Sequence, residues 1–240
     1  MKLVKLKTVD STNNWALKHF EELEDLTVVY ADSQTSGKGR FDRKWVSSDC
    51  ENIYASFVLK PQNFTHIANF TQYMSLVVVN VLKFFNVSAK IKWPNDVLVE
   101  NNKICGILCE TYRKKNETKG VVLGVGINLN MPKKTLEELG RPAVSLNLVL
   151  NRHIDRDDFL NRLTQEFLKN YASVVENGFL HIKQGYLHNV EFLNKKVFIQ
   201  QRDGAEKLEY TVLNVTDDGS LVVCNDKDEV STIYSGDLIL

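Results

Sequence analysis

Residues 34–45 (QTSGKGRFDRKW) combine glycines, cationic side chains and an indole in one short segment that follows an apolar, strand-like run. Gly37 and Gly39 allow unusual backbone angles and a close approach of the chain to a ligand. Asp42 is the acidic residue among the cations, which are Lys38, Arg40, Arg43 and Lys44. This mixture is typical of a loop that closes over a small anion. The alternative for the segment taken alone is a solvated basic turn.

A second polar segment, Trp93-Pro94-Asn95-Asp96, stands where proline is expected to end a strand. Asn95 offers an amide donor and acceptor. Asp96 offers a carboxylate that could hold Mg²⁺ jointly with phosphate oxygens. Taken alone, the segment is more simply a polar turn between two strands.

A third segment, residues 124–130 (GVGINLN), contains neither a Walker loop nor a complete dinucleotide-binding fingerprint. Its glycines, like Gly106 in a neighbouring apolar run, permit a bend or close packing. Together the three segments predict a pocket for a phosphate that carries an aromatic base, with Trp45 available for stacking. The sequence therefore favours a nucleotide site without a P-loop.

The composition excludes several classes of protein. The chain has 240 residues, 43% of them hydrophobic, and a formal net charge of zero, which argues against a general nucleic-acid binder. The most apolar window, residues 73–85, is too short to span a bilayer, and the N-terminus lacks the features of a signal peptide. We therefore expect a cytoplasmic protein without a membrane segment. The cysteines show no C-x-x-C pair and the histidines are dispersed, which argues against a transition-metal site.

Apolar periodicity predicts the elements that must position these segments. Asn101-Asn102 is typical of a hairpin turn, and Ser11, Thr12 and Asn13 are candidates to cap the first helix. We expect strands at residues 3–9, 26–31, 52–59, 89–93, 96–100, 103–110 and 120–130, and helices at 15–20, 64–85, 156–175 and 180–187. This order predicts an α+β fold, a mixed or antiparallel sheet with helices packed on one side.

The character of the sequence changes near residue 195, where short alternating strands separated by Asp-Gly and Asn-Asp turns begin. This pattern predicts a small C-terminal β-barrel that depends on a larger neighbour for stability. We expect two domains, a ligand-binding domain at residues 1–188 and the β unit at residues 189–240.

The motifs, in their order and spacing, resemble those of biotin–protein ligases. The residues that carry the resemblance are Ser11-Thr12-Asn13, residues 37–45 (GKGRFDRKW), residues 92–96 (KWPND), residues 103–108 (KICGIL) and residues 124–130. The resemblance implies a class II synthetase-like catalytic domain followed by an SH3-like β-barrel. It implies a ligase that joins biotin to ATP as biotinyl-5′-adenylate, releases pyrophosphate, and transfers biotin to a lysine of a carrier protein with release of AMP.

The resemblance also assigns roles residue by residue. Lys103 is the first candidate for the catalytic cation, with Arg40 and Asp96 beside it, and Asp96 binds Mg²⁺ or orients the incoming lysine. The residues expected to bind biotin are Ser11, Thr12, Asn13, Gln34, Lys38, Gly39, Arg40, Lys103 and Gly106. The residues expected to bind ATP or the adenylate are Lys38, Arg40, Arg43, Trp45, Lys92, Asn95 and Asn128. Lys38 stands where the family often has arginine, and Asp42 where it usually has glycine, which puts the closed geometry of the loop in doubt.

The expected partner is the biotin carboxyl carrier domain of a biotin-dependent carboxylase. The expected assembly is a monomer or a homodimer. The catalytic strand begins almost at Met1, so we expect a ligase without the N-terminal DNA-binding domain of some family members. The alternatives are a lipoate–protein ligase, which shares the chemistry but takes a longer apolar acid, and a non-catalytic module that binds a ligand or a carrier.

Overall fold

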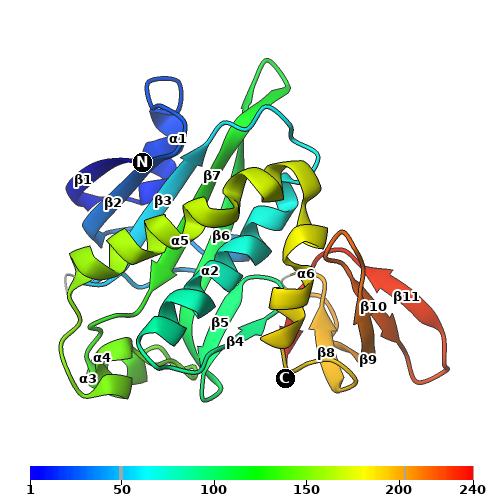
Figure 1. Cartoon of the computed structure of the whole chain (residues 1–240). Coiled ribbons are helices and arrows are strands. Elements are labelled where there is room, and N and C mark those ends of the chain that lie inside the picture. Colours follow the sequence, from blue (N-terminus) through cyan, green and yellow to red (C-terminus); the bar gives the residue numbers. More distant parts are fainter. Residues whose placement is uncertain (49–50, 203, 240) are drawn as a thin grey trace.

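The computed structural model describes residues 1–48, 51–202 and 204–239, without the side chain of Asp42. A seven-stranded sheet in the order β1-β2-β3-β7-β6-β5-β4 forms the body of the molecule (Figure 1). Its strands are β1 (Lys2–Val9), β2 (Thr27–Gln34), β3 (Ile53–Leu59), β4 (Lys90–Lys92), β5 (Asp96–Val99), β6 (Asn102–Lys114) and β7 (Glu117–Ile127). β1 is an edge strand and pairs with β2 in parallel, while the other neighbours in this sheet are antiparallel. The mixed sheet confirms the predicted fold class.

Two helices, α2 (Phe70–Phe84) and α5 (Arg156–Asn177), cover one face of this sheet, and α6 (Phe179–His188) packs against both of them beside the second sheet (Figure 1). They bury a continuous apolar core against the sheet, in which Phe57 of β3 packs on Phe167 of α5 with ring centroids 4.9 Å apart. Asp155 caps the start of α5, because its side chain accepts a hydrogen bond from the Asp158 amide. This face of the sheet is closed, so a ligand has to bind on the other.

The short helix α1 (Thr12–Lys18) lies on the opposite face. Ala16 and the nearby Phe20 pack there on Val29, Val58 and Val122, which alternate with the residues of the main core. The rest of this face is left to the segments that carry the predicted chemistry. The prediction of helices on one side is therefore confirmed for the long helices, and α1 is an addition on the other side.

Two hairpins bring the polar segments together. β5 and β6 pair around Glu100 and Asn101, both with positive φ, so the turn is centred one residue before the predicted Asn-Asn pair. β6 and β7 continue to Lys114 and Glu117, beyond the strand ends expected at residues 110 and 120. The predicted helix at residues 64–85 begins at Phe70, after the short 3₁₀ turn Ile67–Asn69.

Residues beyond 189 form a second sheet of five strands in the order β11-β10-β9-β8-β12. Its strands are β8 (Lys196–Gln200), β9 (Leu208–Val215), β10 (Leu221–Cys224), β11 (Val230–Ile233) and β12 (Asp237–Ile239). The predicted small β unit is confirmed, whereas its closure into an SH3-like barrel stays a prediction. The sequence missed β12 and the short helices α3 (Lys133–Glu137) and α4 (Leu146–Leu150).

The turn between β9 and β10 anchors the second sheet to the first. The carbonyl of Gly219 accepts hydrogen bonds from Trp93 Nε1 at 3.1 Å and from Gln72 Nε2 at 2.7 Å, and the Asp218 carbonyl accepts one from Asn69 Nδ2 at 2.8 Å. Trp93 is only 2% exposed. The tryptophan of the W-P-N-D segment thus joins the two sheets, directly beside the polar residues that follow it. Within the described residues, no helix is long and apolar enough to cross a bilayer.

Candidate active site

A cavity of about 890 Å³ lies against the α1 face of the large sheet, between the basic segment and the second sheet. Its walls bring together segments that are far apart in the sequence, including both ends of the chain. The predicted site residues that line it are Ser11, Thr12, Asn13, Gln34, Lys38, Gly39, Arg40, Arg43, Trp45, Lys92, Asn95, Asp96, Lys103 and Gly106. Their roles stay predictions, but their convergence on one cavity is a finding.

A buried polar network surrounds the start of α1. Gln34, at the end of β2, accepts hydrogen bonds through Oε1 from the Thr12 amide at 2.8 Å and from Thr12 Oγ1 at 3.2 Å. The Ser56 hydroxyl lies 2.8 Å from Thr12 Oγ1 and 2.5 Å from Asn13 Oδ1, and Asn13 Nδ2 donates to Glu110 Oε2 at 2.7 Å. These fixed donors and acceptors suit a polar ring system such as the ureido head of biotin.

Capping of α1 differs from the prediction. Ser11 occupies the N-cap position, but its side chain makes no capping hydrogen bond. Gln34 satisfies the first helical amide instead, from a different element. The hydroxyl and amide groups expected to cap the helix are therefore turned into the network that lines the cavity.

The basic segment forms a narrow backbone loop. The Gly39 amide donates to the Arg43 carbonyl at 2.7 Å, and the Trp45 amide donates to the Gly37 carbonyl at 2.8 Å. The 3₁₀ turn Arg40–Asp42 forms its tip, with Phe41 in the left-handed region at φ 55°. The side chain of Asp42 lies outside the described part of the chain. The effect of this residue on closure of the loop therefore stays a prediction.

The indole of Trp45 lies on a floor of two glycines that pair with each other across β6 and β7. A Cβ at Gly106 would stand 2.8 Å from Trp45 Cζ3, and one at Gly126 would also clash with the indole. Lys103 Nζ lies 5.5 Å from the centre of the Trp45 ring system. Gly106 is one of the residues expected to bind biotin, and in this structure the space beside it accommodates Trp45 and the side chain of Lys103.

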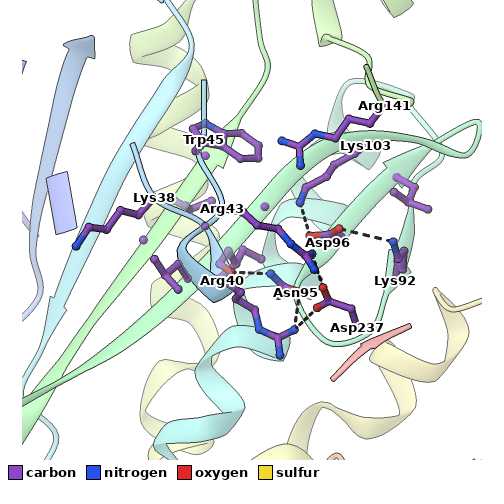
Figure 2. Close-up of a pocket in the computed structure, with 18 of the residues that line it drawn as sticks. Lys38, Arg40, Arg43, Trp45, Lys92, Asn95, Asp96, Lys103, Arg141 and Asp237 are labelled. Atoms are coloured by element: carbon purple, nitrogen blue, oxygen red, sulfur yellow. Dashed lines mark hydrogen bonds and ion pairs between the residues drawn. The ribbon is translucent and has the colours of Figure 1, made fainter. Parts of the chain in front are cut away.

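Asp237 of β12 holds two arginines of the basic loop (Figure 2). Arg40 Nη1 donates to Asp237 Oδ1 at 2.9 Å and to the Gly236 carbonyl at 2.9 Å, and Arg43 Nη1 pairs with Asp237 Oδ2. Burial lowers the pKa of the Arg40 guanidinium, and the negative charges of Asp237 and Asp96 oppose that shift. The second sheet therefore sets the position of cations that the sequence assigns to the ligand.

A second ion-pair cluster surrounds Asp96. Lys103 Nζ lies 2.6 Å from Asp96 Oδ1, and Lys92 Nζ lies 4.0 Å from Asp96 Oδ2. Asn95 precedes Asp96 in the chain and contacts the first cluster, because its Oδ1 accepts a hydrogen bond from Arg40 at 3.3 Å. Its Nδ2 donates to the Ile107 carbonyl at 3.0 Å. Figure 2 shows the two clusters side by side, with Lys38 pointing away from both.

Asn128 and Arg141 line a small cavity below Trp45. Asn128 is buried and donates through Nδ2 to the Val144 carbonyl at 3.1 Å. The loop that carries Arg141 is joined to Lys103, whose amide donates to the Pro142 carbonyl at 3.2 Å. Both residues thus adjoin the indole that the sequence assigns to adenine.

Sequence reasoning missed Ser56, Glu110, Arg141 and Asp237. Ser56 had a signal, since it is a small hydroxyl-bearing residue inside the fully buried strand β3. Asp237 had no such signal, because its contact with Arg40 joins residues 197 positions apart, and local sequence patterns cannot reveal such a contact.

A resident metal centre receives no support. In the described parts of the chain, no group of three or more His, Cys, Asp or Glu side chains could hold a metal ion. Asp96 offers one carboxylate, already flanked by two lysines. This donor set fits a Mg²⁺ ion that arrives with nucleotide phosphates and takes one or two protein ligands.

Comparison with known proteins points to the same family that the sequence motifs resemble. The model of the biotin/lipoate A/B protein ligase family matches residues 5–128. The biotin–[acetyl-CoA-carboxylase] ligase of Paracoccus denitrificans is 30% identical over 224 residues, which cover 91% of this chain and 92% of that protein. The bifunctional ligase/repressor BirA of Bacillus subtilis is 29% identical over 217 residues, which cover 89% of this chain but only 66% of BirA.

The likeness extends to the whole described fold. The solved structure of a biotin protein ligase from Aquifex aeolicus, in complex with biotin and ATP, matches with a TM-score of 0.84 and 26% identity. That match covers 99% of this chain and 97% of the Aquifex chain, so it includes both sheets.

Proposed function

This chain belongs to the biotin/lipoate A/B protein ligase family, and we propose that it is an ATP-dependent biotin–protein ligase. It activates biotin as biotinyl-5′-adenylate and transfers the biotinyl group to a specific lysine of a biotin carboxyl carrier domain. One observation carries the proposal: a single cavity is lined both by the polar network at α1 and by the cations around Asp96 and Asp237. Such a cavity can hold a polar acid and a nucleotide together.

In the first step, a biotin carboxylate oxygen attacks the α-phosphorus of ATP, and the bond from phosphorus to pyrophosphate breaks. Two anions have to meet, so positive charge must offset their repulsion and the charge of the transition state. Lys103 and Arg40, which both line the cavity, supply this charge. Trp45, with Asn128 behind it, holds the adenine, and Lys92 faces the phosphates. Mg²⁺ would arrive with ATP as part of the substrate and would offset phosphate charge, and Asp96 is the carboxylate that would hold it.

In the second step, the neutral amine of the acceptor lysine attacks the acyl carbon, the bond from carbon to the phosphate oxygen breaks, and AMP leaves. The attacking nitrogen loses a proton, which passes to solvent water. Asp96 is the carboxylate that orients this amine when no metal occupies it, because it already binds one ammonium, that of Lys103, at 2.6 Å.

The basic loop serves as a lid over the adenylate. A mixed anhydride hydrolyses readily, so water has to be excluded until the acceptor arrives. Residues 1–188 form the catalytic domain and residues 189–240 a small domain that helps to position the lid through Asp237. Because the reaction consumes ATP, we assign the protein to the cytoplasm.

The test is mass spectrometry of a purified biotin carboxyl carrier domain after incubation with this protein, ATP and biotin. The expected result is a mass increase of one biotin on a single lysine, with pyrophosphate released. Lipoate in place of biotin provides the comparison. Modification of the carrier domain by lipoate but not by biotin would favour the lipoate ligase. If no pyrophosphate is released with either acid, the protein is a non-catalytic binding module.

A further inference from the structure

Glu110 carries a half-buried carboxylate next to the polar network at α1, and it is not among the described residues that line the cavity. It lies in β6, where its backbone pairs with Val122 of β7. Its Oε2 accepts a hydrogen bond from Asn13 Nδ2 at 2.7 Å, and Asn13 does line the cavity. Glu110 can therefore act on a ligand through Asn13.

The side chain of Asn13 has a fixed place, but its amide oxygen and nitrogen could exchange positions. Asn13 is 4% exposed, and a Cβ at Gly124 would stand 2.3 Å from its Oδ1, so the amide lies directly on this glycine. A carboxylate can only accept hydrogen bonds, so Glu110 requires the nitrogen of Asn13 on its side. The Leu108 carbonyl, 3.3 Å from Nδ2, has the same preference but is more distant and carries no charge. Glu110 thus turns the amide oxygen of Asn13 toward Ser56.

The orientation of Asn13 sets the direction of the hydroxyl groups that follow it. Ser56 Oγ lies 2.5 Å from Asn13 Oδ1 and 2.8 Å from Thr12 Oγ1, and its single proton goes to the amide oxygen, which has no proton of its own. Thr12 then donates its proton to Ser56 or to Gln34 Oε1, which lies 3.2 Å away. In either case both lone pairs of Thr12 Oγ1 are left for a donor in the cavity that Thr12 lines. If the amide of Asn13 were reversed, Ser56 would donate to Thr12 and occupy one of those lone pairs.

We infer that Glu110 is a positioning residue for ligand recognition, which keeps Thr12 Oγ1 an acceptor for an N–H group of the bound acid. The inference rests on the proposed function and deepens it, because the ureido head of biotin carries such N–H groups. The dithiolane ring of lipoate carries none. Glu110 thereby favours a urea as the head group of the substrate, although it acts through Asn13 and does not itself line the cavity.

The experiment compares Glu110→Met with Glu110→Gln. Methionine is similar in length to glutamate but accepts hydrogen bonds only weakly, whereas the glutamine oxygen can still accept. Glu110→Gln decides the question if Glu110→Met does not fold. The same two substitutions at Glu117 are the controls, because Glu117 lies at the far end of the same hairpin, is 72% exposed and pairs with Lys119.

Binding of biotin and of desthiobiotin, which keeps the urea but lacks the sulfur ring, is measured by calorimetry without ATP. For Glu110→Met we expect the Kd of both ligands to rise roughly tenfold, the usual cost of one hydrogen bond to a buried polar group. The Kd for Glu110→Gln should fall between those of Glu110→Met and the unmodified protein. The KM for ATP, the rate of pyrophosphate exchange at saturating biotin, the melting temperature and all values for the Glu117 variants should change little, with rates and constants within about twofold.

An unchanged Kd for biotin in both Glu110 variants would overturn the inference. So would a weaker affinity for biotin without one for desthiobiotin, because the urea would then not be the group that is recognised. A loss of exchange rate and melting temperature along with affinity would also overturn it, since Glu110 would then be a structural residue. If the unmodified protein bound no biotin, the proposed function would be rejected instead, and this inference with it.

Discussion

Lys103 illustrates how much of the site depends on one side chain. It is ion-paired to Asp96 at 2.6 Å, lies 5.5 Å from the centre of Trp45, and comes from a strand that is hydrogen-bonded on both sides. It therefore carries a fixed positive charge between the groups assigned to biotin and to the nucleotide. The motif around it made Lys103 predictable, whereas its pairing with Asp96 follows from the register of β5 and β6.

We expect Lys103→Ala to lower the rate of biotin-dependent pyrophosphate exchange by roughly 10²–10³-fold, the usual cost of losing one group that stabilises transition-state charge. The folded state should persist, because Lys103 keeps its backbone pairing in β6. Lys119→Ala is the control, since Lys119 lies in the β6–β7 hairpin and pairs only with the nearby Glu117. A Lys103→Ala protein with full exchange activity would remove Lys103 from its assigned role.

The glycine floor below Trp45 gives a second prediction at this scale. Gly126→Ala places a methyl group where the indole lies, so Trp45 has to move. We expect the KM for ATP to rise roughly tenfold, in line with the loss of one aromatic stacking contact. Steady-state kinetics with varied ATP check this. Gly185→Ala, whose new methyl group would meet only the flexible end of Leu76, should leave the KM unchanged.

At the scale of elements, the long strands and helices could be predicted because each has a continuous apolar pattern. The elements that were missed are short: α3, α4 and β12 have five, five and three residues. Segments of that length contain too few positions to show a period. They form because longer neighbours hold them, as β8 holds β12. The convergence of the motifs on one face depends on the strand order, which no local pattern encodes.

A polar contact joins helix α5 to strand β2 of the large sheet. Arg156, in the first turn of α5, donates to Asp32 of β2 at 2.7 Å, and Lys5 lies 3.5 Å from the same carboxylate. Burial raises the pKa of Asp32, but Arg156 and Lys5 together outweigh this and hold it below its usual value. A carboxyl group with a lowered pKa contributes stability above its unfolded-state pKa. That contribution is lost as the pH falls through the lowered value.

We therefore expect Asp32→Asn to lower the free energy of unfolding by about 1 kcal/mol at neutral pH, a modest cost because Asp32 is partly exposed. The difference from the unmodified protein should shrink as the pH falls below the usual pKa of an aspartate. Urea unfolding at a series of pH values measures it. Asp157→Asn, at a carboxylate 3.8 Å from Arg156 and 76% exposed, should have little effect, and a difference independent of pH would contradict the account.

At the scale of the molecule, residues of both sheets line the candidate active site. Gly219 fixes the second sheet through Trp93 and Gln72, and Asp237 then reaches the arginines of the basic loop. The sequence predicted both units and the loop, but not this connection. Contacts between residues so far apart follow from how the two sheets pack together.

The ion pairs between Asp237 and the basic loop predict the effect of Asp237→Asn. The amide cannot pair with both guanidinium groups, so the loop loses its fixed position, and we expect the KM for ATP to rise roughly tenfold. The melting temperature should change little, because the anchor at Gly219 is intact. Asp226→Asn, in the turn between β10 and β11, is the control. A normal KM for ATP in Asp237→Asn would show that the loop is positioned without the second sheet.

The pairing of Arg40 with Asp237 also has a consequence for the order in which the protein is made. A ribosome synthesises the N-terminal part first, and domains generally fold as they emerge. The basic loop leaves the ribosome early, yet its acidic partner follows only after another 197 positions. A nascent chain that already contains the motifs assigned to biotin and ATP still lacks the carboxylate that holds Arg40 and Arg43. Complete activity should therefore appear only once β12 has been synthesised and has paired with β8.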